Sequence, residues 1–386
     1  MSHVLSIVIP TKNRALYCHS TVKSILTYSE NLQLIVQDSS DGTELQERLF
    51  GIIDTRLFYK KVSPDLNMTE NFDSALKLAT GDYVLMLGDD DGISPQIFDA
   101  VDTCVRMNAD SITSREFYVA YNWPDFRSKY SGDYQAGKLS INLKFDSIVT
   151  EIDMPKEIRN FLNNAGQGCM ALPRIYHGLI SQSLIQNIRN LHGACFFGVS
   201  PDVSFAFLAA VHSRRHLIAN FPITIAGASG GSNAGRSALR THKGDLWADP
   251  HMEHYKTEVW PSVIPEFFSV ESVWAQAALA AVDLESPNYR ARFNFGYLYA
   301  LMFMRHGDRR SQTGKAISAY MATSSESNFK LRMVIYANMA GLAVATARSA
   351  FQSVMARFVR SNNDMTPAID IETASIILKL TLQREK

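Results

Sequence analysis

The chain has 386 residues, of which 46% are hydrophobic and 20% are charged. These proportions are typical of a folded globular protein, and the length predicts roughly two domains with a sizeable core. Lys and Arg together number 38, as do Asp and Glu, so the net charge is zero and nothing in the composition marks a nucleic-acid-binding protein.

The sequence also bears on the cellular compartment. No run approaches the roughly 18 apolar residues of a membrane-spanning helix. The N-terminus has a short apolar stretch with no basic segment before it, which is typical of a first strand rather than a signal peptide. The four cysteines are scattered without CxxC spacing, as expected of reduced thiols. These features predict a cytoplasmic protein.

The first part of the chain alternates strand and helix patterns. Short apolar runs predict strands over residues 5–10, 32–38, 56–62 and 82–87. Apolar residues at helical spacing predict helices over residues 15–28, 43–53, 68–79 and 94–107. This alternation predicts an α/β fold with a mostly parallel central sheet flanked by helices. In such sheets, ligands bind at the carboxyl ends of the strands.

The pattern changes further along the chain. It is less regular from residue 110 to about residue 220. Residues 226–238, AGASGGSNAGRSA, are the most Gly- and Ser-rich segment and predict a loop. From about residue 259 the pattern is helical. We therefore expect one domain over residues 1–258 and a C-terminal helical region over residues 259–386.

Three adjacent carboxylates, Asp89, Asp90 and Asp91, follow the strand predicted at residues 82–87. Carboxylates at a strand end can bind a hard divalent cation, and Mg²⁺ or Mn²⁺ there would hold the diphosphate of a nucleotide. The competing interpretation is a solvated acidic turn. Asp38 ends the strand predicted at residues 32–38, where its carboxylate could accept a hydrogen bond from a nucleobase or belong to a turn without ligand.

Three segments carry a family resemblance when they are taken together. SIVIPTKNR, IVQDSSDGT and NFDSALKLATGDYVLMLGDDDGISP resemble the start of a family 2 glycosyltransferase of the GT-A fold, in order, spacing and strand context. The resemblance implies an inverting transfer of a sugar from a nucleotide diphosphate donor, with Mn²⁺ or Mg²⁺ bound. It also implies that residues 1–110 bind the nucleotide sugar and that residues 111–258 hold the acceptor half and a lid loop.

The same resemblance implies roles for individual residues. The residues expected to contact the donor are Pro10, Thr11, Arg14, Asp38, Asn71, Asp89 and Asp90. Asp38 is the expected contact to the base, and the aspartate triplet is the expected metal motif. Gly88 stands where the family has the first aspartate of that motif. The expected ligands are therefore Asp91 with either Asp89 or Asp90, and this choice stays open.

An inverting transfer needs a general base to take the proton of the acceptor hydroxyl. The resemblance implies a carboxylate at the start of a helix, and Asp202 in GVSPDVSFAFLAAVHS is the best match. The alternative is a first-turn aspartate that only interacts with the helix dipole. Rival candidates for the base are Glu151, Asp153 and Glu157.

The Gly-rich segment and the residues after it are expected to form a lid over the donor. His242 is the expected additional metal ligand, with His251 as an alternative. Arg236, Arg240 and Lys243 are available to face the diphosphate.

These inferences predict an inverting, metal-dependent glycosyltransferase that acts on a hydroxyl of a glycan or lipid-linked acceptor. The resemblance suggests bacterial surface polysaccharide synthesis, such as capsule, O-antigen or lipopolysaccharide. One alternative is a sugar nucleotidyltransferase, which should carry a Gly-rich loop after the first strand, whereas PTKNRAL has no glycine. The other is a non-catalytic module that binds a nucleotide sugar or a protein partner.

The C-terminal helices combine aromatic and methionine residues with arginines. They could present a basic amphipathic surface to the inner face of a membrane. Packing against the catalytic domain or a second copy in a homodimer is the favoured alternative. No nucleic-acid partner is expected.

Overall fold

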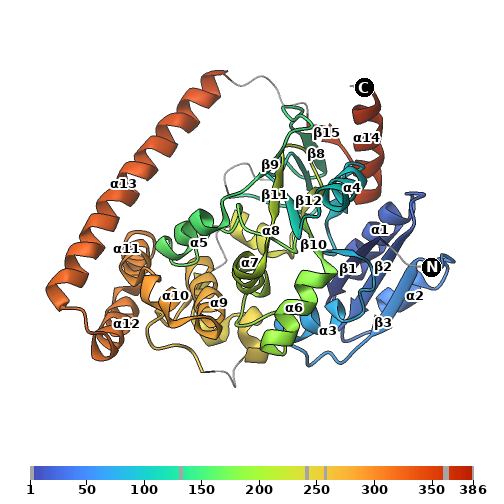
Figure 1. Cartoon of the computed structure of the whole chain (residues 1–386). Coiled ribbons are helices and arrows are strands. Elements are labelled where there is room, and N and C mark those ends of the chain that lie inside the picture. The colour runs from blue at the N-terminus through green and yellow to red at the C-terminus, as the bar shows by residue number, and fades with distance from the viewer. Residues whose placement is uncertain (1–3, 130–133, 240–242, 256–258, 360–364, 385–386) are drawn as a thin grey trace.

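The main sheet of the molecule lies between layers of helices. The computed structural model describes residues 4–129, 134–239, 243–255, 259–359 and 365–384. Helices cover both faces of the sheet, and the long helix α13 (Asn328–Val359) stands away from it (Figure 1).

The sheet has the strand order β3–β2–β1–β4–β10–β6–β11–β9. The strands are β1 (Leu5–Thr11), β2 (Leu32–Asp38), β3 (Leu57–Lys61), β4 (Tyr83–Met86), β6 (Ser111–Ser114), β9 (Val149–Glu151), β10 (Gly178–Ser181) and β11 (His216–Ala219). The ladder from β3 to β4 is parallel, as predicted, and β6 pairs in parallel with β11. Strands β10 and β9 pair antiparallel with their neighbours. The N-terminal half therefore has the predicted parallel arrangement, and the sheet as a whole is mixed.

The four helices predicted in the first part of the chain are present. They are α1 (Ala15–Leu26), α2 (Glu44–Leu49), α3 (Met68–Leu76) and α4 (Ile97–Met107). Helix α3 begins with a capping box, in which the Asn67 side chain accepts from the Glu70 N–H at 2.8 Å and the Glu70 carboxylate accepts from the Asn67 N–H at 3.0 Å. Such a box satisfies two N–H groups that have no partner within the helix, so it defines where the helix begins.

A second sheet lies beside the first, with the order β15–β8–β7–β12–β5. Its strands are β5 (Gly92–Ile93), β7 (Val119–Asn122), β8 (Lys138–Ile141), β12 (Thr224–Ala228) and β15 (Thr366–Pro367). A separate short pair joins β13 (Lys243–Gly244) to β14 (Phe268–Ser269).

The prediction of a loop over residues 226–238 was wrong at both ends of that segment. Its first residues belong to β12, which pairs in parallel with β7, and its last residues form the short helix α8 (Asn233–Ala238). The Ser232 hydroxyl accepts from the Gly235 N–H at 3.1 Å and caps this helix. The small side chains that suggested a loop allow β12 to lie directly against the backbone after β4.

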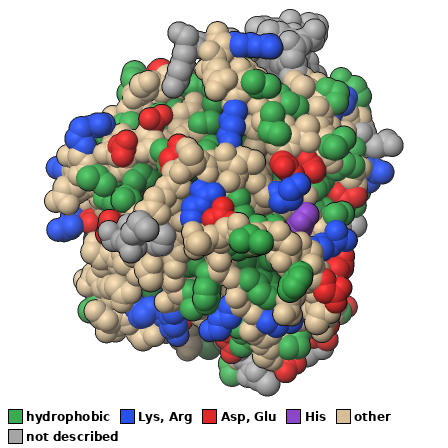
Figure 2. Space-filling view, turned by 90° about the vertical axis from the view of Figure 1, so that its right-hand side faces the viewer, with side chains coloured by type: hydrophobic (Ala, Val, Ile, Leu, Met, Phe, Trp, Pro, Cys, Tyr) green, Lys and Arg blue, Asp and Glu red, His purple; other side chains and the backbone are tan. Residues whose placement is uncertain are grey.

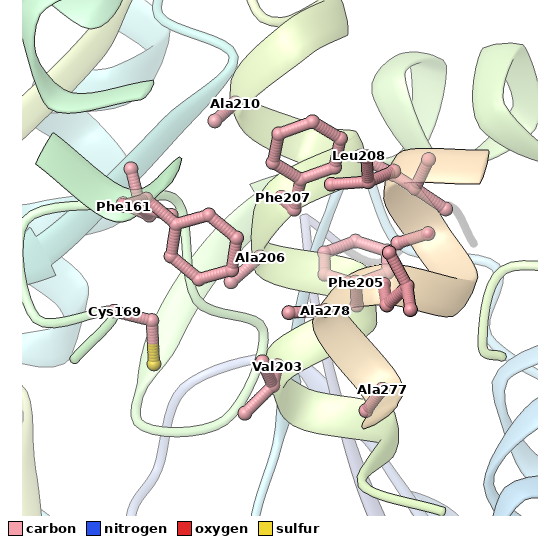
Figure 3. Packing of buried hydrophobic residues seen from close by; sticks show 14 of the residues in the cluster. Phe161, Cys169, Val203, Phe205, Ala206, Phe207, Leu208, Ala210, Ala277 and Ala278 are labelled. Carbon is pink, nitrogen blue, oxygen red and sulfur yellow. The ribbon is translucent and has the colours of Figure 1, made fainter. Parts of the chain in front are cut away.

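The helices α5 (Met154–Asn163), α6 (Gln182–His192), α7 (Pro201–His212) and α9 (Val270–Leu284) surround the largest hydrophobic core. Helix α7 is apolar on nearly all sides, as expected of a helix enclosed by neighbours. The rings of Phe161 and Phe207 stack with their centres 5.5 Å apart, and Ala277 and Ala278 of α9 lie close to α7 (Figure 3). Small side chains on α9 let these two helices pack closely.

The C-terminal region is helical, as predicted. It continues through α10 (Pro287–Arg292), α11 (Phe295–Arg305), α12 (Arg310–Thr323), α13 and α14 (Ile371–Arg384), with a short 3₁₀ turn at η3 (Gly307–Arg309). Two further 3₁₀ turns, η1 (Leu246–Ala248) and η2 (Pro250–Tyr255), precede this region. Helix α14 returns to the N-terminal half, where Lys23 of α1 pairs with Glu372 at 2.8 Å. The Lys379 ammonium lies 3.4 Å from the centre of the Tyr28 ring. The last helix therefore packs against α1 rather than against the helices that precede it in the sequence.

Charges of both signs are mixed on the surface of the molecule. On the face drawn in Figure 2, basic and acidic side chains are interspersed, and among the described residues drawn there neither sign forms a continuous patch.

The cysteines are in the state that the sequence predicted. All four are buried and free. Within the described residues, no helix combines the length and the apolar character that crossing a membrane requires.

Candidate functional site

A cavity of about 770 Å³ opens at the carboxyl edge of the parallel strands. Thr11 ends β1 opposite Asp38 of β2, and the aspartate triplet follows β4, which pairs with the other side of β1. Because these strands run in the same direction, their ends meet at one edge of the sheet. The predicted site residues that line the cavity are Pro10, Thr11, Arg14, Asn71, Asp89, Asp90, Asp91 and Asp202.

Arg14 compensates two carboxylates of the triplet. Its guanidinium donates to Asp89 Oδ1 at 2.6 Å and lies 2.8 Å from Asp90 Oδ2. Thr11 donates to the other oxygen of Asp89 at 2.6 Å. Burial lowers the pKa of Arg14, but the charges of Asp89 and Asp90 outweigh this effect, so its pKa is raised. A largely buried arginine side chain therefore supplies positive charge to the triplet.

Asp90 and Ser229 connect the triplet to the segment after β12. The hydroxyl and the N–H of Ser229 donate to Asp90 Oδ2 at 2.6 and 3.1 Å. The Arg14 guanidinium in turn donates to the Ser229 hydroxyl at 2.7 Å. The other oxygen of Asp90 accepts no hydrogen bond from the described residues, although Asp90 lines the cavity. This leaves one carboxylate oxygen of the triplet available to a ligand.

Asp91 is held by the backbone on both sides. The N–H of Gly227 donates to Asp91 Oδ1 at 2.6 Å, and the N–H of Gly88 donates to Asp91 Oδ2 at 2.9 Å. Burial raises the pKa of Asp91 well above its usual value, and the charge of Asp90 raises it further. The position of the Asp91 carboxylate is therefore set by the N–H groups of Gly88 and Gly227.

Gly88, the departure from the family motif, has a steric explanation. A Cβ at this position would overlap the Tyr176 hydroxyl and lie 2.5 Å from Asp91 Oδ2. An aspartate side chain therefore does not fit here without rearrangement of both neighbours. The Tyr176 hydroxyl occupies the volume that a side chain at position 88 would need.

Sequence reasoning missed Tyr176 and His177, which both line the cavity. His177 Nε2 lies 3.5 Å from Asp91 Oδ2, and its Nδ1 lies 2.9 Å from the Thr224 hydroxyl. Burial, with a smaller contribution from Arg174, lowers the pKa of His177 to about 3, so the imidazole is neutral at pH 7. His177 also has a φ of 63°, an uncommon conformation for a residue other than glycine. No local sequence pattern marks either residue, because they reach the triplet through the bridge between Tyr176 and Met86 of β4, just before β10 begins.

The donor set around the triplet fits a hard divalent cation. Carboxylate oxygens are the preferred ligands of Mg²⁺ and Mn²⁺. The Asp90 oxygen that accepts no hydrogen bond, the Asp91 carboxylate and His177 Nε2 could supply such ligands. His242, which the sequence suggested as a ligand, lies outside the described residues.

The carboxylate of Asp38 does not line the cavity. The residue is fully buried, Tyr59 donates to its Oδ2 at 2.8 Å, and the Ser40 N–H donates to its Oδ1 at 2.8 Å. The neighbouring Ser39 lines the cavity, and its hydroxyl accepts from the Asn71 amide at 3.2 Å. In this arrangement Ser39 and Asn71, rather than Asp38, face the space near the end of β2.

Asp202 is the one of the four candidate bases that lines the cavity. It lies in the first turn of α7, directly after Pro201, and the Ser200 hydroxyl donates to its Oδ1 at 2.7 Å. Glu151 is exposed and pairs with Arg215. The other two rivals lie at the start of α5, where Asp153 caps the helix and Glu157 follows in its first turn. The geometry thus separates Asp202 from its rivals.

Residues 231–233 and Ser237, after β12, line the cavity, whereas the described basic residues of this segment do not. Arg236 pairs with Asp249, and neither Arg236 nor Lys243 lines the cavity. His251 does line it, but its Nε2 is 2.7 Å from the Val199 carbonyl oxygen. Arg240 lies outside the described residues.

Lys12 and His254 form a contact at the cavity that the sequence did not suggest. Lys12 Nζ donates to the Pro64 carbonyl at 2.5 Å and lies 3.0 Å from His254 Nε2, and both side chains line the cavity. Lys12 thus adds a second basic group to the cavity, in addition to Arg14.

Gly227 offers a direct test of the close approach between β12 and the triplet. A Cβ on Gly227 would overlap the carbonyl oxygen of Asp90. We expect Gly227→Ala to lower the free energy of unfolding by about 1–3 kcal/mol, because backbone cannot yield as a flexible side chain does. Urea denaturation measures this loss. Gly244→Ala is the matched control, since no atom lies within 4 Å of its added Cβ. Equal losses in the two variants would contradict the proposed packing.

Comparisons with known proteins bear on the N-terminal part of the chain. Residues 6–150 match the family model described as Glycosyl transferase family 2. A comparison with curated protein sequences gave no significant match.

Two solved structures resemble the chain weakly. Residues 1–349 of TarS from S. aureus, in complex with UDP-GlcNAc, are 14% identical with a TM-score of 0.46, over 84% of this chain and 93% of that one. The mannosyltransferase PcManGT from Pyrobaculum calidifontis, in complex with GDP-Man and Mn²⁺, is 14% identical with a TM-score of 0.43, over 100% of this chain and 88% of that one.

The family match coincides with the part of the structure that the sequence motifs singled out. It contains β1 to β4 and their parallel ladder, Arg14 after β1 and the aspartate triplet after β4. Residues 6–150 thus match glycosyl transferase family 2, and the structure gives this part of the chain the predicted α/β fold with its parallel ladder.

Proposed function

We propose that the chain transfers a sugar from a nucleotide diphosphate donor to a hydroxyl of an acceptor, with inversion at the anomeric carbon. One observation carries this proposal: the family motif at the carboxyl edge of β1 and β4 shares a cavity with the carboxylate of Asp202. A donor site and a general base facing one cavity are what a direct displacement requires.

The donor is proposed to bind along the edge of the parallel strands. Ser39 and Asn71 offer a hydroxyl and an amide near the end of β2, where the nucleoside would lie. Arg14 and Lys12 supply positive charge for the diphosphate. The carboxylate of Asp38 would instead stabilise this edge through Tyr59 and the Ser40 N–H.

Asp90 and Asp91, with His177 beside them, are the residues proposed to hold Mn²⁺ or Mg²⁺. A divalent cation bound there would offset the charge of the donor diphosphate and of the departing nucleotide. Asp89 is engaged by Arg14 and Thr11, so its proposed role is to orient Arg14 rather than to coordinate the ion.

Asp202 is proposed to act as the general base. The Ser200 hydroxyl holds Oδ1, so Oδ2 is the oxygen that would take the proton of the acceptor hydroxyl. As this proton leaves, the acceptor oxygen forms a bond to the anomeric carbon. The bond from that carbon to the diphosphate oxygen breaks on the opposite face, and this single displacement inverts the configuration.

The acceptor class and the cellular setting rest on the sequence resemblance. We propose a glycan or lipid-linked acceptor in bacterial surface polysaccharide synthesis, reached from the cytoplasmic side of the membrane. The exposed face of α13, which includes Phe329, Met333 and Tyr336, offers apolar contacts to a membrane surface or a second copy of the chain.

The donor proposal can be tested by thermal shift with a panel of nucleotide sugars, with and without Mn²⁺. We expect one nucleotide class to stabilise the protein, by about 2.7 kcal/mol at a hundredfold excess over the Kd. The shift should be larger with Mn²⁺ and should lose its metal dependence in Asp90→Asn. Asp99→Asn, which removes an exposed carboxylate of α4, is the control. Absence of a shift with every nucleotide sugar would contradict the proposal, whereas binding without transfer would identify a non-catalytic module.

A further inference from the structure

Two histidines and one glutamate meet at a point away from the cavity. His192 Nε2 lies 3.1 Å and His212 Nε2 lies 2.6 Å from the same oxygen of Glu285, Oε1. All three candidate ligand atoms lie within 4.8 Å of one another. We propose that His192, His212 and Glu285 form a binding site for Zn²⁺ or a similar transition metal ion, separate from the proposed donor site.

The three residues come from the ends of three packed helices. His192 is the last residue of α6, His212 is the last residue of α7, and Glu285 is the C-cap of α9. Helix α7 packs against both α6 and α9. The C-terminal end of a helix carries a partial negative charge, so three such ends favour a cation at their meeting point. The helix ends therefore favour a bound cation, as the Glu285 carboxylate does.

The donor set matches zinc rather than magnesium. Two imidazole nitrogens and one carboxylate oxygen are a ligand set of zinc sites that keep a fourth position open. Magnesium prefers oxygen ligands in octahedral geometry, and this group offers only one carboxylate. The side chains are 11%, 18% and 12% exposed for His192, His212 and Glu285, so an ion can enter and water can fill the remaining position.

The alternative to a metal is a pair of hydrogen bonds from two imidazoles to one carboxylate oxygen. In that state both Nε2 atoms carry a proton and donate to Glu285 Oε1. A bound ion needs the lone pair of each Nε2, so each neutral imidazole would carry its single proton on Nδ1 instead. The exchange needs small side-chain rotations, because ligand atoms around zinc lie farther apart than hydrogen-bonded atoms.

The position of the site indicates a structural role. Helix α7 carries Asp202 at its start and His212 at its end, ten residues later, which is about 15 Å along a helix. Helix α9 has Val273 and Trp274 at the cavity and Glu285 at its other end. An ion that ties the far ends of α7 and α9 would restrict how these helices move relative to each other at the cavity, without touching the reacting groups.

Cobalt titration of the chelator-treated full chain tests this proposal, because tetrahedral Co²⁺ absorbs visible light. We expect one such ion in the wild type, and Co²⁺ affinity at least about tenfold lower in His212→Gln and Glu285→Gln. Glu285→Gln keeps an oxygen that can accept from both imidazoles, so it carries the test if His212→Gln does not fold. Zn²⁺ should raise the melting temperature of the wild type but not of Glu285→Gln.

Two controls separate this site from the rest of the molecule. His19→Gln removes an imidazole on α1, outside the cluster, and should leave the cobalt spectrum unchanged. Asp90→Asn should also leave it unchanged, because the proposed donor site lies elsewhere. A wild type without tetrahedral Co²⁺, or a spectrum that survives in both cluster variants, would overturn the proposal. A spectrum lost in Asp90→Asn alone would assign the ion to the donor site and overturn it as well.

Discussion

Asp202→Asn is expected to slow sugar transfer by about 10²–10⁴-fold, the usual contribution of a general base. The amide has nearly the shape of the carboxylate, but it cannot accept the proton of the acceptor hydroxyl. Ser200 can still donate to the side-chain oxygen, so the start of α7 should keep its structure. Transfer is measured by release of the nucleotide diphosphate, and donor binding by calorimetry.

The donor Kd should change little, because the proposed role of Asp202 is to deprotonate the acceptor and not to bind the donor. Glu157→Gln is the matched control, since Glu157 is also a first-turn carboxylate but does not line the cavity. That variant should transfer sugar at the wild-type rate. If Asp202→Asn retained the rate, or if it lost donor binding and transfer together, Asp202 would not be the base.

Arg14→Met is expected to lower the free energy of unfolding in chelator by about 3–5 kcal/mol, as when one partner of a buried ion pair is removed. The substitution leaves two adjacent buried carboxylates, Asp89 and Asp90, without the guanidinium that contacts both. Urea denaturation measures the loss. Mn²⁺ should restore part of it, because a cation bound by the triplet would replace some of the missing positive charge.

Arg48→Met provides the comparison for Arg14. Arg48 forms an exposed pair with Glu44 one helical turn away, and such pairs contribute at most about 1 kcal/mol. A loss in Arg14→Met no larger than in Arg48→Met would show that water already compensates the triplet. Full loss with no recovery in Mn²⁺ would contradict the proposed metal ligands while leaving the role of Arg14 intact.

Much of the N-terminal half was predictable because its signals are local. The apolar run at residues 5–10 corresponds to β1, and the helical spacing at residues 68–79 corresponds to α3. Short-range patterns reflect burial on one or both faces of an element, so they specify its type without its neighbours. The order of the elements then implied a parallel ladder, and the polar strand ends implied the cavity edge. The placement of Arg14 and the triplet at that edge followed from the family motifs.

Contacts between residues distant in the sequence could not be predicted in this way. Gly88 was an unexplained departure until Tyr176, 88 positions later, was found in the space beside it. The Gly-rich segment looked like a loop because its small side chains cannot form a core, yet Gly227 is where β12 meets the backbone of Asp90.

The contacts of Asp38 and of the histidine and glutamate cluster were unpredictable for the same reason. Asp38 ends its strand as predicted, but Tyr59 of the neighbouring strand holds its carboxylate away from the cavity. His192, His212 and Glu285 lie at helix ends that no local pattern relates to one another. Periodicity records whether a residue is buried, and the partner that buries it is chosen by the packing of whole elements, which depends on the entire chain at once.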